Sequence, residues 1–273
     1  MPKNLNSGIP YSSRILLFLP NRIYVRFYNW RRLKHGESVR LVVCGNILKA
    51  SQLDRVWFTS KFRARLLASG LDHRGSAMFH MYHLSRIQFK DGDKIVDVGA
   101  NTGDLLLGFM RDEIEINYCA IEPSSEEFQI LSLNAPGHSK LFQVAAYSES
   151  KILDLHSRRK TASSSVIQGP GKGPKIPTRA VRLDDLDLGT ETIKLLKVEA
   201  EGAEPEVLLG ATKVLEKTIF VTIDCGFERG KKQESTEVEV VGILEKSGFC
   251  ILEKYTQGAR VCILFRNSNM QFS

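Results

Sequence analysis

Short apolar runs alternate with amphipathic segments along the chain from residue 94 onward. An apolar run of about 4–8 residues is typical of a buried strand, whereas apolar residues three or four apart indicate a helix. The first elements predicted in this way are strands at 94–98, 117–121 and 141–147 and helices at 103–111 and from residue 124 onward. Ser124 and Glu127 form a capping box, which marks the start of the second helix. This repeat of strand and helix predicts a parallel sheet with helices on its faces.

The alternation is interrupted between residues 150 and 183. Two short strands are predicted at 152–156 and 179–183. Between them lies the segment Ser163–Pro177, which contains three glycines, three prolines and three serines. These residue types favour turns, so we expect an exposed surface loop.

The alternation resumes at residue 193 and continues to a closing pair of strands. The elements predicted here are strands at 193–199, 218–224, 249–255 and 261–265, with helices from Pro205 and from Thr236. The last two strands are separated by five residues, and strands joined so closely must pair antiparallel. The whole pattern predicts a mostly parallel, seven-stranded α/β sheet with an antiparallel C-terminal hairpin. This is the topology of the class I methyltransferases, a Rossmann-like fold.

The first 90 residues have a different pattern, which predicts a basic, mainly helical accessory region. Ile23, Phe27 and Trp30 recur at helical spacing, and basic residues lie between and beside them. Such a basic amphipathic helix either lies at a bilayer interface or packs on the main domain as an accessory helix. A second helix is expected at 76–88. We therefore divide the chain into an accessory region at 1–90, a catalytic domain at 91–266 and a C-terminal tail at 267–273.

Charge separates the same two regions. Residues 1–70 contain 13 lysines and arginines but only two acidic residues, a net charge of +11. The rest of the chain has 25 lysines and arginines against 29 acidic residues, a net charge of −4. A strongly basic leader indicates a polyanionic neighbour, either a membrane surface or nucleic acid. We expect contact with an anionic membrane through residues 14–40, with nucleic acid as the less favoured partner.

The location of the protein is also constrained by sequence. The apolar run Ile15–Leu19 is far shorter than the roughly 20 residues of a spanning helix, and no signal-peptide cleavage site follows it. The five cysteines are widely spaced and form no C-x-x-C pair, which favours a reducing compartment over a disulfide framework. The sequence therefore predicts a cytoplasmic protein at the inner face of the membrane.

The most informative motif is the turn Asp97–Asp104, which ends an apolar strand and opens a helix. Gly99 and Gly103 provide backbone freedom, and we expect that they let a ligand approach closely. A dinucleotide site needs G-x-G-x-x-G, but here Asn101 occupies the second glycine position. Asp97 and Asp104 would repel a pyrophosphate. They suit a ligand with a cationic amino-acid end, such as S-adenosylmethionine with its ammonium and sulfonium groups.

The next strand ends in Glu122 and Pro123. An acidic residue at this position of a Rossmann-like fold accepts hydrogen bonds from ribose hydroxyls. Glu122 follows Gly99 by 23 residues, close to the spacing of about 20 that such sites show. We assign Glu122 and Pro123 to the ribose side of the site. Ala145 and Ala146, after the third strand, are expected to line the adenine.

Four segments of the chain resemble one known family. They are Asp97–Gly103, Ile121–Pro123, Leu183–Leu186 and Lys197–Leu208. Together they are similar to the FkbM-type methyltransferases over roughly residues 85–266, and the last segment is the most distinguishing. The family usually has aspartate where this chain has Glu199.

The resemblance implies S-adenosylmethionine as the methyl donor and an oxygen as the methyl acceptor. The acceptor oxygen belongs to a hydroxyl of a sugar, polysaccharide or natural product, so polysaccharide modification is the expected process. Glu199 and Asp224 are the candidates for a base that removes the hydroxyl proton, or for positioning the ligand. These two with Glu201 are also able to hold a divalent cation. We do not favour that metal site and assign no metal ligands.

Two functions are alternatives to methyl transfer to a sugar-like hydroxyl. An RNA-directed methyltransferase, or an RNA-binding module, would use the basic leader with Tyr24, Phe27, Tyr28 and Trp30 for base stacking. The net positive charge, however, is confined to the leader. An oxidoreductase that binds NAD is disfavoured by Asn101.

Overall fold

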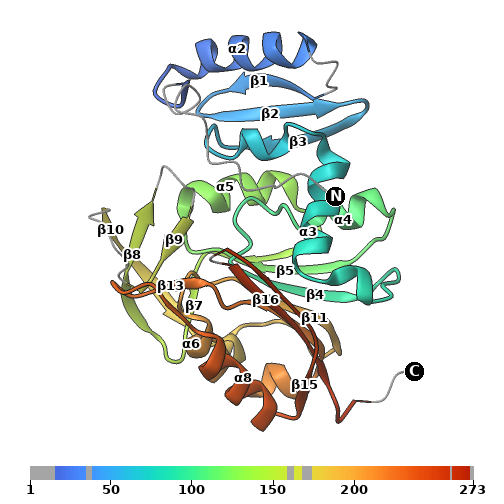
Figure 1. Ribbon diagram of the computed structural model, residues 1–273, viewed down its shortest axis with the longest axis vertical. Coiled ribbons are helices and arrows are strands. Elements are labelled where there is room, and N and C mark those ends of the chain that lie inside the picture. Colours follow the sequence, from blue (N-terminus) through green and yellow to red (C-terminus); the bar gives the residue numbers. More distant parts are fainter. Residues whose placement is uncertain (1–15, 35–38, 159–162, 168–173, 259, 271–273) are drawn as a thin grey trace. The chain divides into compact units, whose positions relative to one another are not determined.

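The computed structural model describes residues 16–34, 39–158, 163–167, 174–258 and 260–270 (Figure 1). The chain divides into two compact units, Met1–His73 and Arg74–Ser273. Each unit is described by itself below. The first ends well before residue 90, where the sequence analysis placed the end of the accessory region.

The first unit consists of a helix and a three-stranded antiparallel meander. Its elements are α2 (Asn21–Lys34), β1 (Arg40–Cys44), β2 (Ile47–Gln52), β3 (Arg55–Thr59) and the 3₁₀ turn η1 (Ala64–Leu67). The strands pair in the order β1-β2-β3. Helix α2 is the basic helix predicted from the spacing of Ile23, Phe27 and Trp30. Residues 40–59, which the sequence analysis placed in a mainly helical region, form strands instead.

Helix α2 packs on β1 through both apolar and polar contacts. Tyr24 and Tyr28 on the helix are buried, as is Leu41 on the strand. The side chain of Asn29 bonds the backbone of Leu41 in both directions, because its amide donates to the carbonyl at 2.8 Å and its oxygen accepts the N–H at 2.9 Å. This pairing fixes the helix against the edge strand and satisfies backbone groups that the meander leaves unpaired.

The second unit is built on a seven-stranded sheet in the order β15-β16-β12-β11-β4-β5-β6. Its strands are β4 (Lys94–Val98), β5 (Asn117–Ile121), β6 (Lys140–Phe142), β11 (Ile193–Val198), β12 (Thr218–Asp224), β15 (Phe249–Gln257) and β16 (Arg260–Asn267). The neighbours from β12 to β6 are parallel, whereas β16 pairs antiparallel with both β12 and β15. The predicted class I methyltransferase topology, with its antiparallel C-terminal hairpin, is confirmed.

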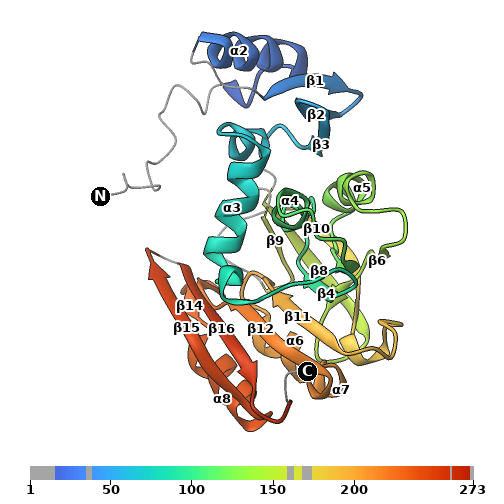
Figure 2. The same cartoon turned by 90° about the vertical axis from the view of Figure 1, so that its right-hand side faces the viewer.

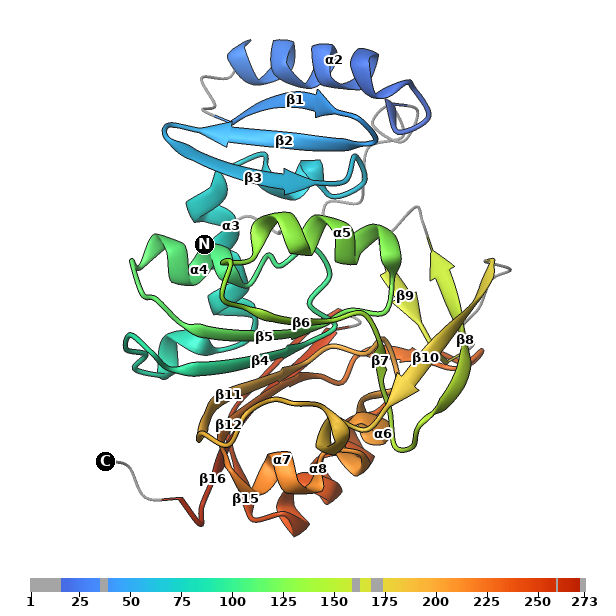
Figure 3. The same cartoon turned by 180° about the vertical axis from the view of Figure 1, so that it is seen from behind.

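Helices cover both faces of this sheet. They are α3 (Leu71–Met81), α4 (Leu106–Arg111), α5 (Ser125–Asn134), α6 (Glu204–Leu209), α7 (Thr212–Glu216) and α8 (Glu237–Lys246). Helices α4 and α5 lie on one face and α6, α7 and α8 on the other (Figures 2 and 3). All five residues of β4 are buried, as its position in the middle of the sheet requires. Burial on both faces is why the parallel strands are apolar runs in the sequence.

A second, four-stranded sheet is inserted after β6. Its strands are β7 (Ala145–Ala146), β8 (Lys151–Arg158), β9 (Ser163–Ser165) and β10 (Lys175–Val181), in the order β7-β10-β8-β9. The single strand predicted at 141–147 is therefore divided between the two sheets. The loop predicted at Ser163–Pro177 begins with β9 and ends inside β10, and its residues 168–173 lie outside the described residues.

The remaining short elements are the pair β13 (Phe227–Arg229) and β14 (Glu234–Ser235) and the 3₁₀ turns η2 (Leu84–Arg86) and η3 (Leu183–Asp185). Within the part of the chain that the structure describes, no helix combines the length and the apolar character needed to cross a membrane.

Candidate active site

Four acidic residues of the predicted site lie at the carboxyl ends of neighbouring strands. Asp97 is the penultimate residue of β4, and Asp224 is the last residue of β12. Glu122 and Glu199 directly follow β5 and β11. Because the strands are parallel neighbours, all four reach the same edge of the sheet, where ligands of open α/β folds bind.

The turn after β4 requires glycine for a reason internal to the protein. Gly99 has a φ of +70°, and a Cβ there would lie 1.8 Å from the carbonyl oxygen of Glu199. We expected a ligand to approach this glycine closely, but its close neighbour in the structure is the backbone of Glu199, directly after β11. The tight turn continues through Asn101 and Gly103, which also have positive φ values of +52° and +84°. The turn therefore brings Glu199 against the β4 end of the site.

Glu122 joins two turns of the site through its carboxylate. One oxygen accepts the N–H of Asn101 at 2.8 Å, and the other accepts the N–H of Ser124 at 2.9 Å. Burial raises the pKa of Glu122 to about 7, although these two hydrogen bonds favour the charged form. Pro123 is half-buried in the same turn. Each oxygen of Glu122 keeps a further lone pair, as a partner of a ribose diol requires.

Asp97 is held inside a buried network. Its carboxylate accepts the hydroxyl of Tyr118 at 2.7 Å and pairs with the ammonium of Lys197 at 2.8 Å. Both Asp97 and Lys197 are at least 98% buried. The pKa of Tyr118 is well above its usual value, because burial and the neighbouring Asp97 both oppose its ionisation. The charge that was expected to meet the ligand's ammonium group is thus balanced by a lysine of the protein itself.

Asp104 is similarly paired. It accepts the hydroxyl of Thr102 at 2.7 Å and forms an ion pair with Arg74 at 2.8 Å. Asn134 donates to the carbonyl of Thr102 at 2.8 Å and holds the same turn from α5. These contacts secure the shape of the turn, and the assignment of Asp97 and Asp104 to the ligand stays a prediction.

Glu199 is more accessible than Asp97, Glu122 and Asp224, with its side chain 24% exposed. It accepts the hydroxyl of Tyr82 at 2.5 Å and lies 3.4 Å from the ammonium of Lys197 and 3.3 Å from the guanidinium of Arg260. Burial, and then the Glu199 charge, raises the pKa of Tyr82 well above its usual value, so the phenol stays a donor. Glu199 is therefore oriented from three sides.

Arg260 connects Glu199 to Asp224. Its Nε lies 3.1 Å from one oxygen of Asp224, whose other oxygen accepts the N–H of Gly226 at 3.1 Å. Burial raises the pKa of Asp224 to about 6; Arg260 opposes this shift, and Glu199 adds to it. The two candidate bases thus share one arginine.

The loop after Glu199 is closed by Glu204. One oxygen of Glu204 accepts the N–H groups of Ala200 and Gly202 at 3.0 Å each, and the other accepts the hydroxyl of Thr236 at 2.9 Å. Gly202 has a φ of +100°, and a Cβ there would lie 2.8 Å from the Cα of Arg229. This part of the segment Lys197–Leu208 therefore has a structural role, because it fixes the loop that presents Glu199.

A further acid, Glu228 on β13, responds to the negative charge of this edge. Burial, and then the charges of Glu201, Asp224 and Glu199, raise its pKa to about 9. Among the described residues, however, no group of three or more histidine, cysteine or acidic side chains is arranged to hold a metal ion. Ala145 and Ala146 are buried in β7, which follows β6 in the chain but belongs to the inserted sheet, where it pairs with β10.

Three contributors to the site were missed from sequence. Tyr82 and Arg260 lie in segments with no motif, one after α3 and one in the C-terminal hairpin. Lys197 carried a usable signal, because a lysine inside the apolar strand Ile193–Val198 must find an opposite charge. Its position two residues before Glu199 directs it to the same side of β11.

Comparisons with known proteins place this geometry in a family. The model of the methyltransferase FkbM domain matches residues 97–251. The chain belongs to the FkbM methyltransferase family. This is a family of S-adenosylmethionine-dependent enzymes, so the protein is a methyltransferase with that donor. No curated protein matches the chain.

Solved structures with similar folds are distant in sequence. Fibrillarin from Aeropyrum pernix, with natively bound S-adenosyl-L-methionine, is 9% identical with a TM-score of 0.45, over 84% of this chain and 99% of that one. Ribosomal protein L11 methylase from Lactobacillus delbrueckii subsp. bulgaricus is 14% identical, with a TM-score of 0.42 over 71% and 79% of the two chains. Precorrin-6y C5,15-methyltransferase from Geobacter metallireducens is 10% identical, with a TM-score of 0.40 over 70% and 86%.

The residues present fit S-adenosylmethionine at its ribose end. Glu122 offers two carboxylate oxygens, each with one lone pair in use, at the carboxyl end of the strand beside β4. The assignment of Ala145 and Ala146 to the adenine stays a prediction. The donor's cationic end would meet an edge whose carboxylates outnumber its cations.

Proposed function

We propose that the protein transfers a methyl group to a hydroxyl oxygen of a sugar, polysaccharide or natural product. The observation that carries this proposal is the pair Glu199 and Asp224, which Arg260 connects at the carboxyl edge of the sheet. A hydroxyl must lose its proton as it attacks carbon, and a carboxylate held near the methyl group can accept it. The sugar-like acceptor rests on the resemblance to FkbM-type enzymes.

S-adenosylmethionine, when bound, supplies a methyl group already activated by its sulfonium leaving group. The new bond forms between the acceptor oxygen and the methyl carbon, the bond from carbon to sulfur breaks with its electron pair on sulfur, and the hydroxyl proton passes to the base. Glu199 is our choice for that base because it is partly exposed, whereas Asp224 is 1% exposed. Tyr82 and Arg260 orient the Glu199 carboxylate.

The charge of this edge supports an uncharged acceptor over a nucleic acid. The charge of Glu199 raises the pKa of Asp224. The pKa of Glu228 is raised in turn by the charges of Glu201, Asp224 and Glu199. Such shifts are expected for an edge with excess negative charge. Phosphate groups of RNA would be repelled here, whereas hydroxyls of a carbohydrate donate readily to carboxylates. An acceptor rich in hydroxyls and poor in negative charge therefore fits best.

The inserted sheet provides the acceptor side in this proposal. Ser165 on β9 is 8% exposed, and its hydroxyl donates to the carbonyl of Glu201 at 2.7 Å. This bond ties the insertion to the loop that begins at Glu199. Exchange of Ser163–Pro177 should consequently alter acceptor use and leave donor affinity within about twofold.

The test is methyl transfer from labelled S-adenosylmethionine to a panel of acceptors. Neutral oligosaccharides, acidic oligosaccharides and total RNA are offered separately to the purified full chain. We expect label in the neutral oligosaccharides as a base-stable methyl ether, and none in RNA. Transfer to RNA alone would contradict the acceptor assignment, while donor binding without transfer to any sugar in a broad panel would count against it.

A further inference from the structure

The outer face of α2 carries a ridge of exposed apolar side chains. Ile23, Phe27 and Trp30 are 50%, 36% and 60% exposed and lie at positions i, i+4 and i+7 of the helix. The rings of Phe27 and Trp30 stand 5.8 Å apart. The opposite face of the same helix buries Tyr24 and Tyr28 in its own unit. The helix therefore has two apolar faces, and the inner one is buried in its own unit.

Arginines border this ridge on both sides. At about 100° per residue, Arg22 and Arg26 project on one side of the ridge and Arg31 on the other. No acidic residue occurs between Leu16 and Lys34. An apolar centre with cationic margins is the arrangement of helices that lie in the interface of an anionic bilayer.

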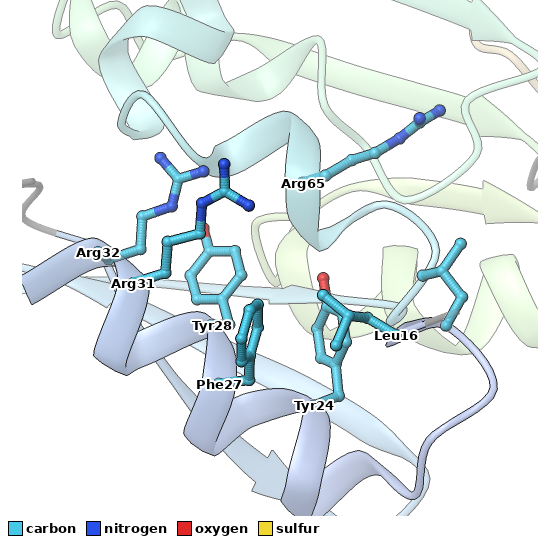
Figure 4. Close-up of a pocket in the computed structure, with 8 residues that line it drawn as sticks. Leu16, Tyr24, Phe27, Tyr28, Arg31, Arg32 and Arg65 are labelled. Atoms are coloured by element: carbon cyan, nitrogen blue, oxygen red, sulfur yellow. The ribbon is translucent and has the colours of Figure 1, made fainter. Parts of the chain in front are cut away.

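A pocket adjoins the Phe27 side of the ridge (Figure 4). It has a volume of about 110 Å³ and is lined by Leu16, Leu17, Tyr24, Phe27, Tyr28, Arg31, Arg32 and Arg65. Tyr28 is only 7% exposed, yet its hydroxyl has no hydrogen-bond partner among the described residues. Arg31 and Arg65 are exposed and form no ion pair with a carboxylate in that part of the chain. The pocket thus combines apolar walls with three arginines, of which Arg31 and Arg65 form no ion pair with a carboxylate among the described residues.

We propose that this face of the first unit binds a bilayer that contains anionic phospholipid. The ridge Ile23–Phe27–Trp30 enters the boundary between headgroups and acyl chains. The phosphate of one lipid lies at the pocket mouth beside the exposed Arg31 and Arg65. Arginine pairs well with phosphate.

The side chains favour a membrane over single-stranded RNA. Base stacking needs exposed aromatic faces, but the rings of Tyr24 and Tyr28 are buried at 6% and 7% exposure. The exposed part of the ridge includes Ile23, which cannot stack on a base, and the pocket wall includes the aliphatic Leu16 and Leu17. RNA binding is consequently an outcome that would overturn the proposal.

Tryptophan fluorescence of the full chain reads out this contact directly. The chain has only two tryptophans, and Trp57 is 1% exposed, so Trp30 reports changes in solvent contact. We add vesicles of phosphatidylcholine with or without about one quarter phosphatidylglycerol. Anionic vesicles should shift the emission to the blue and sediment the protein, whereas neutral vesicles should bind at least about tenfold more weakly. Trp30→Phe should abolish the shift and retain sedimentation.

Matched variants separate specific contacts from general attraction. Arg22→Glu combined with Arg26→Glu should weaken binding to anionic vesicles at least about tenfold, and Arg65→Glu at least about threefold. Arg40→Glu reverses an exposed charge on the other face of the β1–β3 meander and should have a smaller effect than either. Ile23→Ser should weaken binding more than Leu53→Ser, a control side chain that is 88% exposed in the same unit. Thermal melting of each variant confirms that it is folded.

Several results would overturn the proposal. These are equal binding to neutral and anionic vesicles, no emission shift on sedimentation, or Arg40→Glu matching the double reversal. Tight binding to a single-stranded RNA with no binding to vesicles would also refute it. The proposal does not depend on the assigned acceptor, because every variant lies in the first unit and donor binding is measured separately.

Discussion

The two units use arginine and lysine in opposite ways. At the carboxyl edge of the main sheet, Lys197 and Arg260 are each placed between two carboxylates. On α2, Arg22, Arg26 and Arg31 border an apolar ridge with no acidic residue between positions 16 and 34. Paired cations orient other side chains, whereas cations without acidic neighbours are available to a partner. The net charges are +11 for residues 1–70 and −4 for the rest of the chain. These totals do not reveal whether a given cation orients a neighbouring side chain or is available to a partner; its immediate neighbours do.

The largest expected effect comes from replacing Glu199, the partly exposed carboxylate at the carboxyl edge of the main sheet. Glu199→Gln keeps shape and hydrogen bonding but removes most of the proton-acceptor strength. If Glu199 is the base, turnover should fall by about 10²–10⁴ with donor affinity little changed. Steady-state kinetics with saturating donor measures the first quantity, and calorimetry the second.

The opposite pattern would change the role of Glu199. Weaker donor binding with nearly intact saturated turnover would make it a positioning residue. A variant normal in both respects would remove Glu199 from the account and leave Asp224 as the base.

The next largest effect concerns the buried cation. Lys197→Met leaves Asp97 buried without its partner, which should cost about 3–5 kcal/mol of unfolding free energy. Lys194→Met, on the same strand but half-buried, should cost much less. Denaturant unfolding measures both. Similar values for the two variants would mean that Lys197 is not held by the carboxylates around it.

A smaller effect is expected from titration of Glu122. With its pKa at about 7, Glu122 is mostly ionised at pH 8 and mostly protonated at pH 6. Only the ionised form accepts from both ribose hydroxyls, so donor affinity should fall about tenfold as the pH falls across this window. The control is Glu122→Gln, which retains any titration of the ligand itself. An identical pH profile in that variant would remove the ribose assignment.

The smallest effect tests the excess of negative charge at the edge. The pKa of Glu228 is about 9 in the folded chain and ordinary when unfolded, so its charge opposes folding as the pH rises from about 5 to 9. Glu228→Gln should therefore raise Tm little at pH 5 and by about 2–4 °C at pH 8.5. The exposed Glu234, on the neighbouring strand, provides the control substitution Glu234→Gln. A difference that does not grow with pH would contradict the influence of Glu201, Asp224 and Glu199 on Glu228.

The fold of the second unit was largely predictable because local patterns agree with it. Apolar strands, the helix start after Ser124 and the glycine turn each depend on neighbours in sequence. The capping box predicted at Ser124 does not form, because its hydroxyl contacts the Glu127 carboxylate instead of a backbone N–H. The insertion was only partly predictable, because the pairing of β7 with β10 joins Ala145 to Ala180, which are 35 positions apart in the sequence. The strands of the first unit were missed because a helix covers their apolar side, and their short alternating runs compete with helical spacing.

The acidic residues of the site could be predicted from the sequence, whereas the cations that pair with them could not. Glu122, Glu199 and Asp224 follow from position, since parallel strands deliver their last residues to one edge. The partners of Asp97 and Asp224 could not be read from sequence, because Lys197 and Arg260 come from distant segments. Gly99 was singled out correctly as a constrained position, but its neighbour is a backbone carbonyl of the protein.

Donor binding tests the central claim most directly. Calorimetry of the purified chain should show binding of S-adenosylmethionine and no binding of NADH. Glu122→Ala should weaken the former by about 1–3 kcal/mol, the usual cost of losing a hydrogen bond to a charged group. Binding of NADH at this site, or S-adenosylmethionine affinity unchanged by loss of Glu122, would contradict the account of the edge given above.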